Sequence, residues 1–111
     1  MKAMNFDEIY SDISRINKKD PATAAERLGK LFEEAGELAQ ALNKTNGRKV
    51  IKKEETSEII ELEILHEAAD TIQNVIAIID GFGWTCEHLM FAMQTKNKKW
   101  EEKVDGKNIQ N

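Results

Sequence analysis

Apolar residues recur at spacings of three and four positions along nearly the whole chain, which is the pattern of an apolar stripe on an α-helix. There is a single proline, Pro21, and almost no run of alternating β-branched residues that would indicate a strand. The pattern therefore predicts an all-α protein. A length of 111 residues leaves room for one domain, residues 1–111, with a core at about 5–103 and a polar C-terminal tail at 105–111.

Capping and turn signals divide the first half of this pattern into two helices. The apolar positions between 6 and 16 form a short first helix. Asp20 is a good N-cap and Pro21 suits a first helical position, so a second helix is expected to begin there. Asn46 and Gly47 form a turn signal at which it should stop.

The second half predicts two more helices. The third covers about 57–80, with Gly81 as a left-handed cap, and it is the most apolar element. Thr85 can cap a fourth helix that fades into the polar tail. So small a chain with so apolar a third helix indicates a four- to five-helix bundle that is completed by oligomerisation, as a homodimer or homotetramer.

Charge and cysteine content narrow the classes of partner. Sixteen Lys and Arg against twenty Asp and Glu give a net charge of -4, which argues against binding nucleic acid through a basic surface. Cys86 is the only cysteine, so a disulfide framework is excluded and a reducing compartment is favoured. No apolar leader or membrane-spanning run is present. We therefore expect a cytoplasmic protein that binds neither nucleic acid nor a membrane.

Pairs of acidic residues mark the second and third predicted helices. Glu34 and Glu37 share one ridge of the second helix, and Glu67 and Asp70 share a strip about 60° wide on the third. Like charges at this spacing repel each other, so each pair favours the binding of a cation. If the two helices pack antiparallel, the four carboxylates can form an all-oxygen cage that suits Mg²⁺ or Mn²⁺. Ordinary solvated surface acids are the alternative.

A di-iron site is a weaker alternative for these acids. Glu63 and His66 form one Glu-x-x-His step, of the kind that ferritin-like proteins use to hold iron. That fold needs two such steps, and His88 has a threonine, Thr85, three positions before it. His66 is therefore interpreted as an ordinary polar residue on a helix face.

Residues 30–38, KLFEEAGEL, and residues 67–74, EAADTIQN, resemble the Glu-Glu-x-x-Glu and Glu-x-x-Asp signature of the MazG-like all-α nucleoside triphosphate pyrophosphohydrolases. The resemblance extends over roughly 21–100. It implies Mg²⁺-dependent hydrolysis, with Mn²⁺ as a possible substitute, of a nucleoside triphosphate, either a (d)NTP or a non-standard NTP. The products would be the monophosphate and pyrophosphate.

Carried over by position, the resemblance also implies the metal ligands, which are Glu34, Glu37, Glu67 and Asp70. Glu67 follows Glu37 by 30 positions, toward the long side for small members, because of a basic insert at Arg48–Lys53. The insert leaves the conformation of this linker open, and its role is not defined by the sequence.

Further residues are candidates for contacts with the substrate or the attacking water. Glu33 lies within one helical turn of Glu37, where it can orient or deprotonate the attacking water. The alternative is that Glu33 is a plain exposed glutamate. Lys96 falls among apolar positions of the last helix, where it can bind phosphate or snorkel along the core. Lys99 is a weaker candidate of the same kind, and Lys30 and Asn74 complete the predicted substrate-binding set.

The acids do not define the substrate. Phosphoribosyl-ATP pyrophosphatase and dimeric dUTPase share related motifs, so these activities remain alternatives. A non-catalytic helical interaction module, with solvated acids and apolar stripes that bind partner helices, is a third interpretation. Four aromatic residues can stack on a base, although such residues more often lie in a core or a subunit interface: Phe32, Phe82, Trp84 and Phe91.

Overall fold

The computed structural model describes residues 2–47 and 51–110, the last two of these through their backbone only. Their secondary structure is entirely helical, without a strand, which confirms the predicted all-α class. Part of the basic insert predicted in the linker, residues 48–50, lies outside the described residues. The four helices are α1 (Phe6–Asn17), α2 (Ala24–Thr45), α3 (Ser57–Gly81) and α4 (Cys86–Gln110).

Capping boxes fix where α1 and α2 begin. Asn5 caps α1 together with Glu8, and Thr23 caps α2 together with Glu26. The predicted start of the second helix at residues 20–21 is therefore wrong by three positions. Asp20 Oδ1 instead accepts a hydrogen bond of 3.0 Å from the backbone N–H of Ala22, which holds the turn ahead of the helix.

Glycines in the left-handed region follow α2 and α3. Asn46 ends α2 as predicted, and Gly47 after it has φ 76°. α3 continues through Gly81, and the left-handed residue is Gly83 with φ 85°, two positions later than predicted. The turn between α3 and α4 therefore needs, at position 83, a backbone conformation that residues with a side chain rarely adopt.

The fourth helix begins where the sequence predicts and ends later. Thr85 Oγ1 accepts a hydrogen bond of 3.3 Å from the backbone N–H of His88, as an N-cap does. The helix continues to Gln110, so residues 105–110 of the segment predicted as a polar tail are helical.

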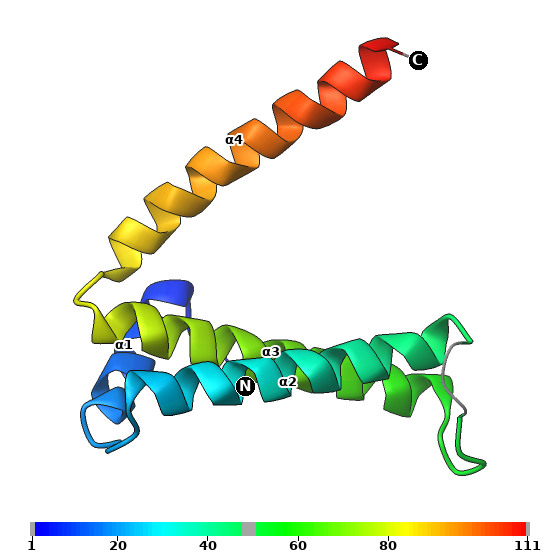
Figure 1. The fold of residues 1–111 in the computed structure, drawn as a ribbon, viewed down its shortest axis with the longest axis horizontal. Helices are drawn as coiled ribbons and strands as arrows, with labels where there is room; N and C mark the ends of the chain where they lie inside the picture. The colour runs from blue at the N-terminus through cyan, green and yellow to red at the C-terminus, as the bar shows by residue number, and fades with distance from the viewer. Residues whose placement is uncertain (1, 48–50, 111) are drawn as a thin grey trace.

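α2 and α3 run antiparallel side by side, and α1 packs against the C-terminal part of α3 (Figure 1). Asn17 Nδ2 at the end of α1 donates to the carbonyl of Ala77, at 3.0 Å, and to the Asp80 carboxylate, at 2.9 Å. The Tyr10 hydroxyl donates to the Trp84 carbonyl at 2.6 Å. These bonds attach α1 to α3 and to the turn that follows it.

A half-buried lysine, Lys44, connects the two ends of the linker. Lys44 Nζ, near the end of α2, lies 2.6 Å from Glu55 Oε2 and 3.1 Å from Glu63 Oε2. The Lys44 and Glu55 side chains are 11% and 15% exposed. The three groups join the end of α2, the linker and the start of α3.

α4 projects away from the other helices and contacts only α1 among them (Figure 1). Trp100, in its second half, is 68% exposed. By length and composition, no single helix in the described parts of the chain could cross a membrane, although α3 and α4 pass that test as a pair bent by 118°.

Candidate metal centre

Carboxylates from α2 and α3 meet where these helices cross. The oxygens of Glu34, Glu67 and Asp70 lie within 4.8 Å of one another. A second group with the same spacing joins Glu34 to Glu33 and Glu37 on α2. Glu34 belongs to both groups, so all four acids that the sequence predicts as metal ligands gather here with Glu33.

Glu34 and Glu67 carry the buried part of this acidic cluster, by which we mean the five carboxylates just named. Glu34 is 5% exposed, although it is charged. Its Oε2 atom and Glu67 Oε2 are buried and accept no hydrogen bond from any described residue. A buried oxygen without a donor is costly in free energy, and a bound cation would remove that cost.

The acids perturb one another's titration. Burial, followed by the carboxylates of Glu37 and Glu34, raises the pKa of Glu67 to about 7. The hydrogen bond from Lys30 lowers the pKa of Glu34, and the same hydrogen bond raises the pKa of Lys30. Near neutral pH, therefore, Glu34 is ionised while Glu67 retains part of its protonated form.

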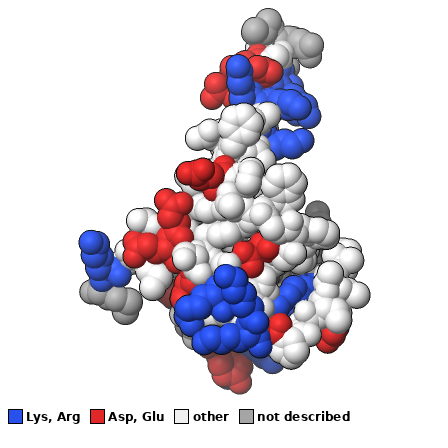
Figure 2. Space-filling view, turned by 90° about the vertical axis from the view of Figure 1, so that its left-hand side faces the viewer, with Lys and Arg blue, Asp and Glu red and all other residues white. Residues whose placement is uncertain are grey.

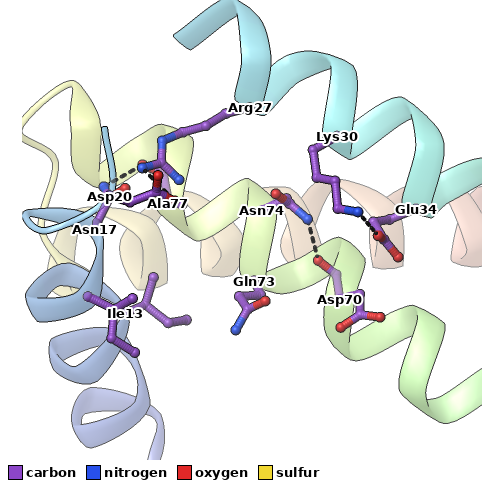
Figure 3. Close-up of a pocket in the computed structure, with 11 residues that line it drawn as sticks. Ile13, Asn17, Asp20, Arg27, Lys30, Glu34, Asp70, Gln73, Asn74 and Ala77 are labelled. Carbon is purple, nitrogen blue, oxygen red and sulfur yellow. Dashed lines mark hydrogen bonds and ion pairs between the residues drawn. The ribbon is translucent and has the colours of Figure 1, made fainter. Parts of the chain in front are cut away.

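Lys30 provides the positive charge nearest to the cluster. Its Nζ lies 3.0 Å from Glu34 Oε1 and 3.6 Å from Glu33 Oε1 (Figure 3). The lysine side chain is 52% exposed, so it can leave the carboxylates for another anion at little cost. This predicted substrate-binding residue thus lies beside the predicted ligands.

The cluster opens into a cleft of about 480 Å³ between α1, α2 and α3. Figure 3 shows Lys30, Glu34 and Asp70 at one end of this cleft and Arg27 toward the other. Asn74, a predicted substrate contact, also lines the cleft. Its Nδ2 donates a hydrogen bond of 2.9 Å to the backbone carbonyl of Asp70. The remaining lining residues are Ile13, Ile16, Asn17, Asp20, Gln73 and Ala77.

Arg27 is the residue of this cleft that the sequence analysis missed. Its side chain is 14% exposed and its Nη2 lies 3.5 Å from Asp20 Oδ2. Arg27 precedes Glu34 by seven positions, which are almost two helical turns and place both on one side of α2. That spacing was the available signal.

Other candidates lie outside the cleft. Lys96 and Lys99 are exposed on α4, and neither lines it. Glu63 forms an ion pair with Lys44, and His66 is exposed. Neither residue of this Glu-x-x-His step belongs to the groups of described side chains that could hold a metal ion. None of the four aromatic candidates for base stacking lines the cleft, and all four are exposed: Phe32, Phe82, Trp84 and Phe91.

Comparisons of the chain with models of protein families, with curated proteins and with solved structures found no match. The resemblance of residues 30–38 and 67–74 to the MazG-like signature is therefore an interpretation of the sequence.

Proposed function

We propose that the protein is a Mg²⁺-dependent nucleoside triphosphate pyrophosphohydrolase whose site is the acidic cluster with its adjoining cleft. One observation carries the proposal. Glu34 and Glu67 hold buried carboxylate oxygens without donors, next to Asp70 and at the mouth of a cleft that also contains Lys30 and Arg27. Such an arrangement is unfavourable by itself and becomes favourable with a cation and an anionic ligand.

The donor set fits Mg²⁺ or Mn²⁺. All the available ligand atoms are carboxylate oxygens, which hard divalent cations prefer, and no described histidine or cysteine joins the groups. Glu34, Glu67 and Asp70 would hold the ion, with Glu37 as a further ligand. Bound there, Mg²⁺ supplies charge neutralisation, polarisation of the phosphoryl oxygens and activation of water.

The cleft has the size and charge for a nucleotide. Its volume of about 480 Å³ lies within the range of small-molecule sites. Arg27 and Lys30 can pair with phosphate oxygens, and Lys30 would be released from Glu34 for this role if a cation neutralised that carboxylate. Gln73 and Asn74 add amide groups along the same wall.

The reaction adds water across the anhydride bond between the α and β phosphates and yields the monophosphate and pyrophosphate. Glu33 is exposed beside Glu34 and Glu37, where its carboxylate can accept the proton that water loses. Protons leave with the solvent, and no covalent intermediate on the protein is needed. The preferred base and sugar stay open, and phosphoribosyl-ATP pyrophosphatase and dUTPase activities belong to the same proposal as alternatives.

Lys96 and Lys99 receive no support as substrate contacts from the arrangement within one chain. Both are exposed on the part of α4 that projects from the other helices (Figure 1). Their predicted role stays a prediction.

The test is pyrophosphate release from a panel of canonical and non-standard ribo- and deoxyribonucleoside triphosphates, phosphoribosyl-ATP included, with Mg²⁺ and with a chelator instead. We expect turnover on at least one nucleotide, dependent on Mg²⁺ and reduced by Asp70→Asn. Glu63→Gln is the matched control, because Glu63 is an acid on the same helix that Lys44 already pairs. Absence of metal-dependent turnover on every nucleotide would defeat the proposal and leave the non-catalytic helical module.

A further inference from the structure

The chain exposes far more surface than its mass requires. Its accessible area is 8995 Å², whereas a compact monomer of 12.6 kDa exposes about 6,200 Å². The radius of gyration is 17.4 Å, against about 13 Å for a compact domain of this length. The excess of about 2,800 Å² per chain is of the size that permanent subunit interfaces bury.

Much of this excess is apolar and follows heptad spacing on three helices. The positions alternate steps of four and three, the pattern of a helix that packs against another helix along a seam. On α2 they are Leu28, Phe32, Ala35, Ala39 and Leu42, all of them exposed. On α3 they are Glu61, Leu65, Ala68, Ile72, Val75 and Ile79, of which only Ala68 and Ile79 are half-buried.

These two stripes lie on one face of the α2–α3 pair, opposite the acidic cluster. At 100° per residue, Phe32 and Ala35 are turned roughly 140° and 160° from Glu37 on α2. Ile72 is likewise turned about 160° from Asp70 on α3. We call this surface the heptad face, and within the described chain no helix covers it.

α4 carries a stripe of the same kind and has no partner for it. Leu89, Met93 and Trp100, which is 68% exposed, keep the alternating steps together with position 96, and Val104 follows Trp100 by four positions. Figure 2 shows that charged side chains gather toward the far end of this projecting helix, while uncharged side chains cover its base. A helix of this kind is stable in water only when its stripe is covered.

The two unpartnered surfaces are complementary in charge. Each of these two stripes includes a charged residue: Glu61 begins the stripe on α3, and Lys96 lies within the stripe on α4. Both are exposed. An ion pair between them would satisfy Lys96 inside an otherwise apolar seam, which explains a lysine at that position.

We propose that a second copy of this chain covers these surfaces, with α4 of each copy lying along the heptad face of the other. The arrangement is isologous, so two identical contacts form and both copies are satisfied at once. A second copy is favoured over another occupant because the chain itself supplies the missing helix, with matching spacing and opposite charge. The proposal does not depend on the enzymatic one, since the heptad face and the cleft lie on opposite sides of α2.

Sedimentation equilibrium of the full chain over a range of concentrations tests the proposal. We expect a dimer at micromolar concentration and a melting temperature that rises with protein concentration. Phe32→Glu and Trp100→Glu should each raise the dissociation constant at least tenfold, on the order of a hot-spot loss. Met4→Glu is the control, since Met4 is 53% exposed and outside the stripes; it should behave as the wild type.

Mixing the two variants tests the exchange of α4. Phe32→Glu damages the heptad face and Trp100→Glu damages α4, so each variant alone has two damaged contacts. A mixed dimer has one intact contact and should recover association. If the mixture stays monomeric while the wild type is dimeric, α4 does not lie on the partner's heptad face.

Two results would overturn the proposal as a whole. A folded wild-type monomer with a melting temperature independent of concentration means that the stripes are covered within one chain or by another molecule. Binding of that monomer to phosphatidylcholine–phosphatidylserine vesicles would assign the apolar surface to a lipid bilayer instead.

Discussion

Glu34 on α2 and Glu67 on α3 bring their carboxylates within 4.8 Å of each other, and each keeps a buried oxygen that accepts no hydrogen bond. Their titration differs, because Lys30 stabilises the ionised form of Glu34 while burial and neighbouring acids disfavour that of Glu67. Two carboxylates this close, with buried oxygens that no described donor satisfies, are unfavourable unless a cation lies between them.

Asp70→Asn should lower turnover on the order of 100-fold or more and weaken Mg²⁺ binding, because it removes one negative charge and keeps the size of the side chain. The melting temperature without metal should stay the same or rise slightly, since Asp70 makes no ion pair with a described residue and the substitution reduces like-charge repulsion. Activity assays and thermal melts of the two proteins measure both effects. If Glu63→Gln is as damaging to turnover, the site has been placed one turn wrong.

The stability of the metal-free protein should fall as the pH rises from about 5 to about 8. The pKa of Glu67 is about 7 in the folded chain, above its ordinary value of 4.5. Between these values the folded state binds more protons than the unfolded state, so raising the pH favours unfolding. Melting temperatures across this range measure the effect. Glu67→Gln should flatten the curve in this window, and an unchanged slope would contradict the assignment.

Lys44→Met should lower the melting temperature, because the ammonium that joins Glu55 and Glu63 is removed while both carboxylates remain. Thermal melts at neutral pH measure the loss. Lys53→Met is the control, since Lys53 is an exposed lysine of the same linker. Equal melting temperatures for the two variants would show that Lys44 does not stabilise the linker.

Tyr10→Phe should cost about 0.5–1.5 kcal/mol of unfolding free energy, which is the usual loss for one hydrogen bond. The hydroxyl donates to the Trp84 carbonyl at 2.6 Å and connects α1 to the turn before α4. Urea denaturation measures the difference. Ser11→Ala, on the exposed side of α1, provides the comparison and should leave the free energy unchanged.

The sequence predicted most of the fold and the grouping of the acids, because both depend on helical periodicity. The end of α2 at Asn46 and the convergence of Glu34 with Asp70 follow from spacing and an antiparallel pair. The start of α2 was misplaced because two capping signals compete, and the reciprocal box of Thr23 and Glu26 is used.

The direction of α4 could not be predicted from the sequence. Periodicity tells which side of a helix is apolar, and it does not tell which surface that side will contact. Trp100 belongs to the apolar stripe of α4, yet it is 68% exposed. Arg27 was missed for a related reason, since its place in the cleft depends on α1 as well as on α2.

α2 carries the acids of the cleft on one side and the apolar residues of the heptad face on the other. Inserting or deleting a single residue inside this helix would rotate everything beyond it by about 100° and would displace both surfaces together. A change of length between Gly47 and Thr56 rotates neither surface. Insertions and deletions should therefore be tolerated in the linker. Inside α2 they should be harmful whether the cleft or the heptad face is the surface that matters for function.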